Sequence, residues 1–225
     1  MYVVDTLNYR VQKFVNGSTT GITIAGITGS QGSAANQFAV PLYFTFDSTD
    51  TYFYIIDLSN NNVMQYLTNS TTGDDGTRVA GGYGADNTKT SLSGGNGIHY
   101  LPLINPDLFI TTNRGHTVMR WTPGASSGVF VAGVPGVAGS NSTLLNQPRG
   151  IRIDKYLNMF VVDFSNHRVQ MFCANNPTGI TIAGTGIAGN SAMQLNTPRV
   201  IAFDTYMNMY IGDAGNNRVQ KFLKY

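Results

Sequence analysis

The sequence predicts an all-β protein of the β-propeller class, and three observations carry this prediction. A thirteen-residue unit occurs five times, and its equivalent valines, Val11, Val63, Val118, Val169 and Val219, lie about 50 residues apart. Each full repeat contains four short apolar stretches bounded by Gly, Asn and Pro turns, which is typical of β-strands. No window shows sustained helical periodicity. Four strands per repeat, arranged in tandem, are typical of propeller blades.

The repeated unit is clearest at 160–172, where a strand at 160–163, a polar turn at 164–167 and a strand at 168–172 form a hairpin. Close copies lie at 2–14 and 210–222, and weaker copies at 54–66 and 109–121. A short strand ending in Ala-Gly follows at 22–26, 78–81, 129–133 and 180–184. Next comes a glycine-rich loop, whose glycines we interpret as positive-φ turn residues. A further strand then follows at 42–47, 97–101, 150–154 and 200–204.

This periodicity predicts a single domain over residues 1–225, with repeat units of roughly 1–26, 27–81, 82–133, 134–184 and 185–225. Counted along the repeats, the first lacks its innermost strand and the last its outermost, which gives eighteen strands. Met1 aligns with the internal Met159 and Met209, so we expect a truncated or incomplete ring whose open edges promote association. A ring of five blades, two of them three-stranded, is the alternative.

The best-preserved repeats also show a family resemblance. Pro148 to Phe172 and Pro198 to Phe222 carry the pattern Pro-x-Gly/Val-Ile-x-x-Asp followed by Asn-x-Phe/Tyr-Val/Ile-x-Asp-x-x-Asn-x-Arg-Val-Gln-x-Phe. This pattern resembles the NHL repeat, and the resemblance covers essentially the whole chain. It implies a propeller that presents the loops of one face to a partner. Among relatives of this family, some bind RNA, and peptidylglycine-type amidating lyases place a zinc-binding histidine at a turn position similar to that of His167.

Charged residues recur at fixed places in the hairpin. Aspartates end its first strand in four repeats, and an arginine follows five residues later in three of them. The third repeat has threonine at both places, so the two charges are lost together. We interpret these residues as ion pairs that brace the turn. The aspartates are Asp5, Asp57, Asp163 and Asp213, the arginines are Arg10, Arg168 and Arg218, and the threonines are Thr112 and Thr117.

The same face is the candidate surface for a partner. Arg149 and Arg199 begin the innermost strands, and His116 and His167 occupy one turn position in adjacent repeats. Together with Arg10, Arg168 and Arg218, these side chains could contact a protein, a peptide or a glycan. Nucleic acid is disfavoured, because three of the arginines face aspartates and few aromatic residues are available to stack bases.

Catalytic chemistry finds little support in the sequence. His99, His116 and His167 could form a zinc site only if they converged, and we expect no metal and no cofactor. The default interpretation of the turn histidines is that they are surface polar residues. The glycine-rich loops lack the lysine of a phosphate-binding loop, and Cys173 reads as a small apolar filler. We therefore expect a protein that is not an enzyme, with a zinc-dependent lyase and a reader of RNA or ligase substrates as the alternatives.

Composition favours an extracellular setting. Only 12% of the residues are charged and the net charge is +2, while Gly, Asn, Ser and Thr fill the loops. Three glycosylation sequons begin at Asn16, Asn69 and Asn141. No apolar run approaches the length of a membrane span. We expect a secreted glycoprotein module that forms part of a longer protein.

Overall fold

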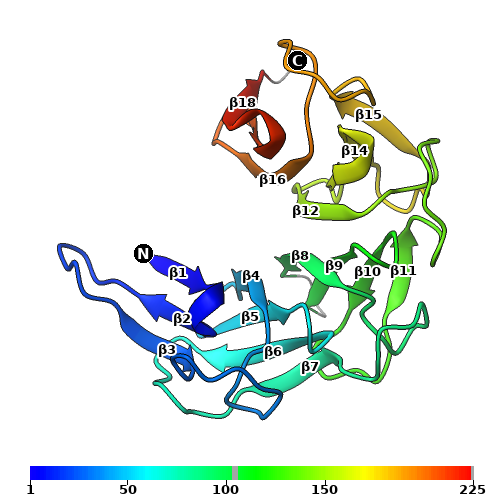
Figure 1. Cartoon of the computed structure of the whole chain (residues 1–225). Coiled ribbons are helices and arrows are strands. Elements are labelled where there is room, and N and C mark those ends of the chain that lie inside the picture. Colours follow the sequence, from blue (N-terminus) through cyan, green and yellow to red (C-terminus); the bar gives the residue numbers. More distant parts are fainter. Residues whose placement is uncertain (103–105, 224–225) are drawn as a thin grey trace. The chain divides into compact units, whose positions relative to one another are not determined.

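A computed structural model of the protein describes residues 1–102 and 106–223. Within these residues the fold is all-β, with eighteen strands and three short 3-10 helices. The strands form five antiparallel sheets, three with four strands and two with three, and each sheet is a blade of a β-propeller (Figure 1). The fold class and the strand number predicted from the repeats are confirmed.

The sheets follow one another along the chain, and neighbouring strands in a sheet are consecutive in sequence. The first contains β1 (Tyr2–Asp5), β2 (Arg10–Lys13) and β3 (Ile22–Gly26). The second contains β4 (Pro41–Phe46), β5 (Tyr52–Asp57), β6 (Asn62–Leu67) and β7 (Thr77–Gly81). The third contains β8 (Gly95–Leu101), β9 (Asp107–Thr112), β10 (Thr117–Trp121) and β11 (Val129–Ala132). The fourth contains β12 (Pro148–Ile153), β13 (Met159–Asp163), β14 (Arg168–Phe172) and β15 (Gly179–Ala183), and the fifth contains β16 (Pro198–Phe203), β17 (Met209–Asp213) and β18 (Arg218–Phe222).

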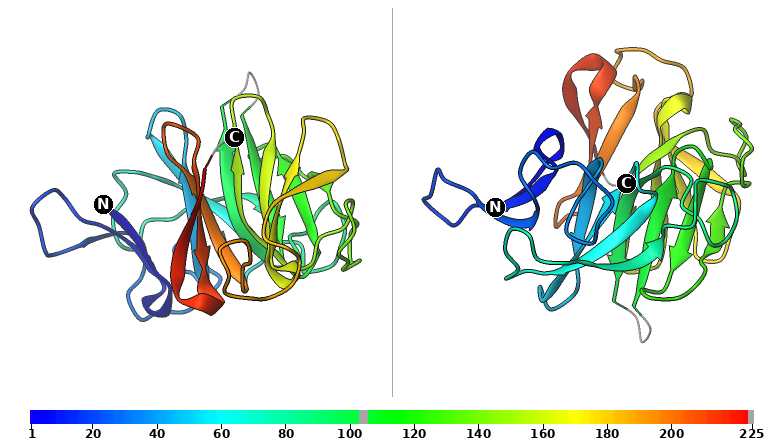
Figure 2. Two further views of the ribbon diagram at one scale, coloured as in Figure 1. Left: turned by 90° about the horizontal axis from the view of Figure 1, so that it is seen from above. Right: turned by 60° about the horizontal axis from the view of Figure 1, so that its bottom comes forward.

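The chain divides into two compact units, Met1–Leu108 with Trp121–Gly128, and Phe109–Arg120 with Val129–Tyr225. Within the first unit β4 lies beside β1 and β8, and within the second β12 lies beside β16. The sheets are twisted, as Figure 2 shows. Each unit has an apolar core built from facing sheets. In the second unit the core includes Val169, Ala183, Leu195 and Ile201, and in the first it includes the equivalent Val11, Ala25 and Phe38.

The repeat valine explains much of this packing. Val11, Val63, Val118 and Val169 are all 0% exposed, whereas Val219 in the fifth repeat is 71% exposed. In the first four repeats the strand register shifts directly after this valine, so that it pairs with the alanine of the Ala-Gly sequence. The bulge turns the fourth strand and lets its small alanine pack beside the valine.

The glycine that follows this alanine is required by the backbone. Gly184 has a φ of +78°, and a Cβ atom there would collide with the carbonyl oxygen of His167. The residue that ends each hairpin turn is also left-handed, with φ of 50° at His167 and 51° at Asn217. Asn and His tolerate this conformation better than most residues, which explains their frequency there. The turns before them are 3-10 helices at η1 (Thr6–Asn8), η2 (Phe164–Asn166) and η3 (Ala214–Asn216).

Two expectations from the sequence need correction. The first strands of the third, fourth and fifth repeats begin at Gly95, Pro148 and Pro198, two residues before the predicted starts. The register shifts that follow the two prolines were not visible in the sequence. The glycine-rich loops are also only partly explained by positive φ. Gly32, Gly139 and Gly189 lack it; a Cβ atom at these positions would instead lie close against the side chains of Gln37, Leu144 and Gln194.

Candidate functional site

The turn of the fourth repeat is held by one buried carboxylate. Asp163 is 0% exposed and accepts hydrogen bonds from Arg168 Nε (2.8 Å), Asn166 Nδ2 (2.8 Å) and the backbone N–H of Asn146 (2.7 Å). Burial raises the pKa of Asp163, against the opposing effect of these hydrogen bonds and of the Arg168 charge. The carboxylate therefore depends on all three donors, since losing any of them leaves a buried charge poorly compensated.

The first and fifth repeats contain the same ion pair with a more exposed arginine. Arg218 Nε lies 2.8 Å from Asp213, and Arg10 Nε lies 2.9 Å from Asp5. The Asp5 side chain is 25% exposed. Burial acts to raise the pKa of Asp5, but hydrogen bonds from Arg10 and Asn8 and the Arg10 charge outweigh it, so the pKa is lowered. The pairs expected from the sequence are thus present. Burial acts to raise the pKa of both Asp5 and Asp163, but it outweighs the hydrogen bonds and the arginine charge only at Asp163.

In the second and third repeats, the turn is stabilised by hydrogen bonds without an Asp–Arg ion pair. Asp57 accepts from the backbone N–H groups of Ala39 (2.7 Å) and Val40 (2.8 Å) and from Asn60 Nδ2 (2.7 Å). In the third repeat the hydroxyls of Thr112 and Thr117 lie 2.7 Å apart, and both residues are buried. A neutral hydrogen bond therefore occupies the place of the ion pair.

The turn arginines also fasten the later part of each glycine-rich loop, 139–145 in the fourth repeat and 189–195 in the fifth. Arg168 Nη2 donates to the carbonyl oxygens of Asn141 (2.9 Å) and Leu144 (3.2 Å). Arg218 Nη2 donates to the equivalent carbonyls of Ser191 (2.9 Å) and Gln194 (2.9 Å). These guanidinium groups are committed inside their own repeats, so the structure does not present them as free basic contacts for a partner.

The remaining arginines of the predicted face differ from one another. The guanidinium of Arg149 lies 3.8 Å from the centre of the Phe164 ring, and the Arg149 carbonyl accepts from the Thr111 hydroxyl (2.5 Å). Arg10 adds a hydrogen bond from Nη1 to the Thr28 hydroxyl (3.1 Å). Arg199, at the start of β16, is exposed. Of the five arginines, Arg199 is therefore the one whose side chain is best placed to meet a ligand.

The turn histidines have a role that the sequence did not reveal. His167 Nδ1 accepts a hydrogen bond from the backbone N–H of Thr197 (3.1 Å), and His116 Nδ1 accepts one from Gln147 (3.1 Å). Thr197 and Gln147 have positive φ and directly precede the strand prolines. Each histidine thus ties its turn to a positive-φ residue of the next repeat, while it stays partly exposed as a polar residue of the turn. Asn61 does the same in the first unit, where its Oδ1 accepts from Gly94 (3.4 Å).

The other predicted positions are dispersed. His99 lies in β8 of the first unit, whereas His116 and His167 belong to the second. Among the residues that the structure describes, no three His, Cys, Asp or Glu side chains gather into a possible metal site. Cys173 is half-buried after β14. The sequon residues Asn16, Asn69 and Asn141 are exposed. No helix in the described ranges is long and apolar enough to span a membrane.

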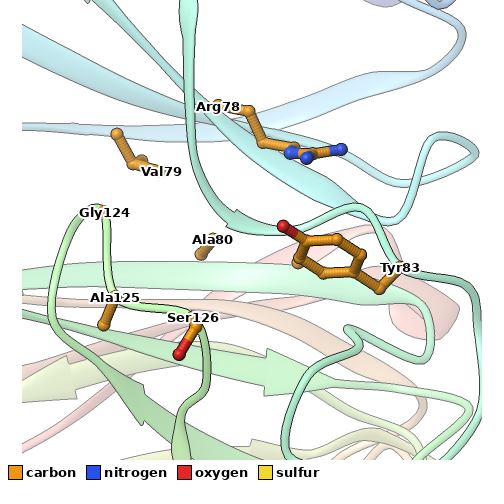
Figure 3. Close-up of a pocket in the computed structure, with 8 residues that line it drawn as sticks. Arg78, Val79, Ala80, Tyr83, Gly124, Ala125 and Ser126 are labelled. Carbon is orange, nitrogen blue, oxygen red and sulfur yellow. The ribbon is translucent and has the colours of Figure 1, made fainter.

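A small cavity that sequence reasoning missed lies in the first unit, beside β7 (Figure 3). Its volume is about 180 Å³. Arg78 and Tyr83 lie on one side and the loop after β10 on the other, as the labelled residues show. The lining is formed by Arg78, Val79, Ala80, Gly81, Tyr83, Gly124, Ala125 and Ser126. The signal that could have located it is the departure of Arg78 and Tyr83 from the repeat pattern.

Solved structures share this fold. An auxiliary nutrient binding protein from Bacteroides thetaiotaomicron matches with a TM-score of 0.67 and 15% identity, over 98% of this chain and 65% of its own. A streptogramin B lyase matches with a TM-score of 0.54 and 10% identity, over 82% of this chain and 51% of its own. A chain of a nidogen–laminin complex matches with a TM-score of 0.57 and 14% identity, over 97% and 76% of the two chains. At these identities the likeness shows the fold alone.

No protein-family model matches the chain, and no curated protein matches it either. The chain spans 65% of the length of the nutrient-binding structure and 51% of that of the lyase. The class defined by fold and site is thus a β-propeller whose blades are braced by polar turns.

Proposed function

We propose that this chain is a non-catalytic binding module of the NHL-repeat type, which presents the loops of one face to a protein, peptide or glycan partner outside the cell. The observation that supports the proposal is the fastening of the glycine-rich loops by Arg168 and Arg218. Loops held in one conformation lose little entropy when a ligand binds, so rigidity favours affinity. A nutrient-binding protein among the structures of similar fold is consistent with this proposal.

The side chains available for binding are exposed ones that do not hold the blades together. Leu7 in η1 is 87% exposed, and Val200 beside Arg199 is 42% exposed. Both lie where a turn or a first strand begins, on the segments that the sequence predicted to form the binding face. Exposed apolar residues flanked by polar ones are a common feature of ligand contacts. We therefore expect Leu7 and Arg199 to contribute to binding in their respective units.

The experiment is a screen of the labelled chain against arrays of glycans, peptides and secreted proteins, followed by calorimetry on each hit. We expect at least one ligand that is bound and recovered chemically unchanged. Leu7→Ala or Arg199→Ala should weaken its binding, while thermal stability should stay at the wild-type value because both side chains are exposed. Turnover of the bound ligand would refute the non-catalytic assignment, and wild-type affinity of both variants would refute the assigned face.

A further inference from the structure

The junction between the second and third repeats departs from the pattern of the other junctions. The residue two positions before the repeat alanine is Thr23, Phe130 or Thr181 elsewhere, but Arg78 here. The residue three positions after that alanine is Thr28, Pro135 or Gly186 elsewhere, but Tyr83 here. The other repeats show that neither Arg78 nor Tyr83 is required to build a blade. Their presence together at one junction calls for another explanation.

Arg78 and Tyr83 form one wall of the cavity. The guanidinium carbon of Arg78 lies 4.8 Å from the centre of the Tyr83 ring, and Arg78 Nη1 donates to the Gly82 carbonyl (3.3 Å). Gly82 has a φ of +83°, and a Cβ atom there would meet the Arg78 side chain at 2.5 Å. The glycine therefore allows the arginine to lie flat across the loop. This stacking orients the guanidinium and leaves most of its N–H groups unused.

The opposite wall is the loop that follows β10, and it is anchored at two points. The indole N–H of Trp121, the single tryptophan of the chain, donates to the Ala125 carbonyl (3.0 Å). The backbone N–H of Gly124 donates to the Val79 carbonyl in β7 (2.8 Å). Trp121 is 1% exposed, so the anchor itself is rigid. Two hydrogen bonds thus anchor the loop wall, whereas Arg78 and the 61% exposed Tyr83 form a wall that is open to solvent.

The contacts of Arg78 differ from those of the turn arginines. Arg10, Arg168 and Arg218 each pair with an aspartate at 2.8–2.9 Å. Arg78, by contrast, makes its hydrogen bond to a carbonyl and its stacking contact to Tyr83, and within the described residues it has no carboxylate partner. A planar, oriented guanidinium beside a cavity matches the two oxygens of a carboxylate.

We propose that this cavity is a subsite for a carboxylate, supplied by a small ligand or by the charged group of a larger one. Its volume of about 180 Å³ is smaller than the pockets that enclose whole drug-sized ligands, so it suits one charged group. Arg78 makes the bidentate contact, Tyr83 holds the guanidinium in place, and the Ser126 hydroxyl lines the other side. The inference rests on the proposed binding function and specifies the chemistry of one contact.

The test is a titration of the ¹⁵N-labelled chain followed by NMR, with glucuronate as a sugar carboxylate, N-acetylglutamate as an amino-acid carboxylate and glucose as a neutral control. We expect one or both acids to shift the amide signals of Gly82 and Gly124, and glucose to leave them unchanged. The acid that shifts them at the lower concentration identifies the source of the carboxylate. Shifts by neither acid, or equal shifts by glucose, would overturn the subsite.

Variants separate the subsite from a general charge effect. Arg78→Gln should weaken carboxylate binding by about tenfold or more, because it removes a charge-assisted pair of hydrogen bonds. Arg78→Lys should bind more tightly than Arg78→Gln but less tightly than the wild type. Lysine keeps the positive charge but lacks the planar pair of N–H donors that can contact both carboxylate oxygens. Arg114→Gln, at an exposed arginine in another turn, should bind as the wild type does. Equal binding by Arg78→Gln and the wild type would contradict the proposal.

The carboxylate subsite and the proposed binding function can fail independently of each other. A ligand found on the arrays whose affinity does not depend on Arg78 would leave the module standing and refute the subsite as its contact. Turnover of every array ligand, with glucuronate or N-acetylglutamate still bound through Arg78, would refute the module and keep the subsite.

Discussion

The turns of the third and fourth repeats end in the same backbone conformation and differ in their chemistry. His116 and His167 end them with φ of 58° and 50°, so both turns close with a left-handed residue, although only the fourth repeat has a 3-10 helix before it. At the base, Asp163 and Arg168 form a buried ion pair in one repeat, and Thr112 and Thr117 share a hydrogen bond in the other. The ion pair is therefore not needed to form the turn.

The ion pair of the fourth repeat includes a side chain that is long enough to contact the neighbouring loop. Arg168 extends from the turn to two carbonyls of the glycine-rich loop, which a threonine is too short to do. The corresponding loop of the third repeat is held by its own side chains instead. Ser93 Oγ donates to the Ala85 carbonyl (2.9 Å), and the hydroxyl of Thr88 donates to Asp86 (2.7 Å). One repeat braces its loop from the turn, and the other has a loop that braces itself.

The largest change in stability is expected when the buried carboxylate of Asp163 is removed. Asp163→Ala should lower the free energy of unfolding by about 3–5 kcal/mol, because Arg168 would remain as a buried, uncompensated charge. Asp5→Ala is the matched control at a partly exposed pair and should cost about 1 kcal/mol or less. Urea unfolding followed by circular dichroism measures both. Equal losses for the two variants would show that burial does not govern the strength of these pairs.

Replacing Asp163 and Arg168 by the two threonines found in the third repeat should cause an intermediate loss of stability. Asp163→Thr combined with Arg168→Thr should cost about 1–2 kcal/mol, because the turn is kept while the hydrogen bonds to the loop are lost. The double variant should be more stable than Asp163→Thr alone, which is the sign of coupling between the two positions. A double-variant loss equal to the sum of the single losses would contradict the idea that the two residues act as a unit.

A smaller loss is expected at the histidine that contacts the next repeat. His167→Ala should destabilise the chain by about 1 kcal/mol, because the N–H of Thr197 loses its acceptor. His167→Asn should recover most of this loss, since Asn61 fills the same role in the second repeat. Thermal melts of the two variants provide the measurement. If the asparagine variant were no more stable than the alanine variant, the side chain would not matter as an acceptor.

The smallest effect concerns pH. Burial lowers the pKa of His116, although the charge of Asp163 opposes this, so the folded state favours the neutral imidazole whose Nδ1 accepts from Gln147. An unfolded histidine titrates near 6.5, and the unfolded chain therefore takes up the proton first. The stabilising contribution is complete above that pH and decreases as the pH falls through the lowered value.

His116→Asn should flatten this decrease in urea unfolding measured between pH 7 and pH 5. Asp163 contributes in the opposite direction, because its raised pKa favours proton uptake by the folded state, and this contribution is common to both proteins. An identical pH dependence for the variant and the wild type would exclude His116 as the responsible group.

The sequence predicted local features well and non-local ones poorly. Each hairpin could be located because strand alternation, Asn turns and Ala-Gly ends are short-range patterns. The pairing of Asp163 with Arg168 was also predictable, since five residues separate them across one turn. The contacts from Arg168 to residues 141 and 144, and from His167 to Thr197, join residues 24 or more positions apart. Only the folded chain shows which carbonyl or N–H meets each side chain.

The cavity beside β7 escaped prediction for a related reason. Arg78 and Tyr83 depart from the repeat, but the sequence does not show that the loop anchored by Trp121 lies opposite them. A departure from the pattern could have been noted, while the shape of the site could not. In a repeat protein the positions that differ between copies are thus good starting points for locating sites.

The fastening of the glycine-rich loops has a consequence for protein engineering. Arg168 and Arg218 contact only backbone carbonyls there, at Asn141 and Leu144 in one repeat and at the equivalent Ser191 and Gln194 in the other. Carbonyls are common to all residues, so the same arginine contacts already accept two loop sequences that share only their first and last residues over 139–145 and 189–195. Exposed loop positions such as Ser142 and Ala192 could therefore be exchanged as libraries, with the blade supplying a constant frame for variable side chains.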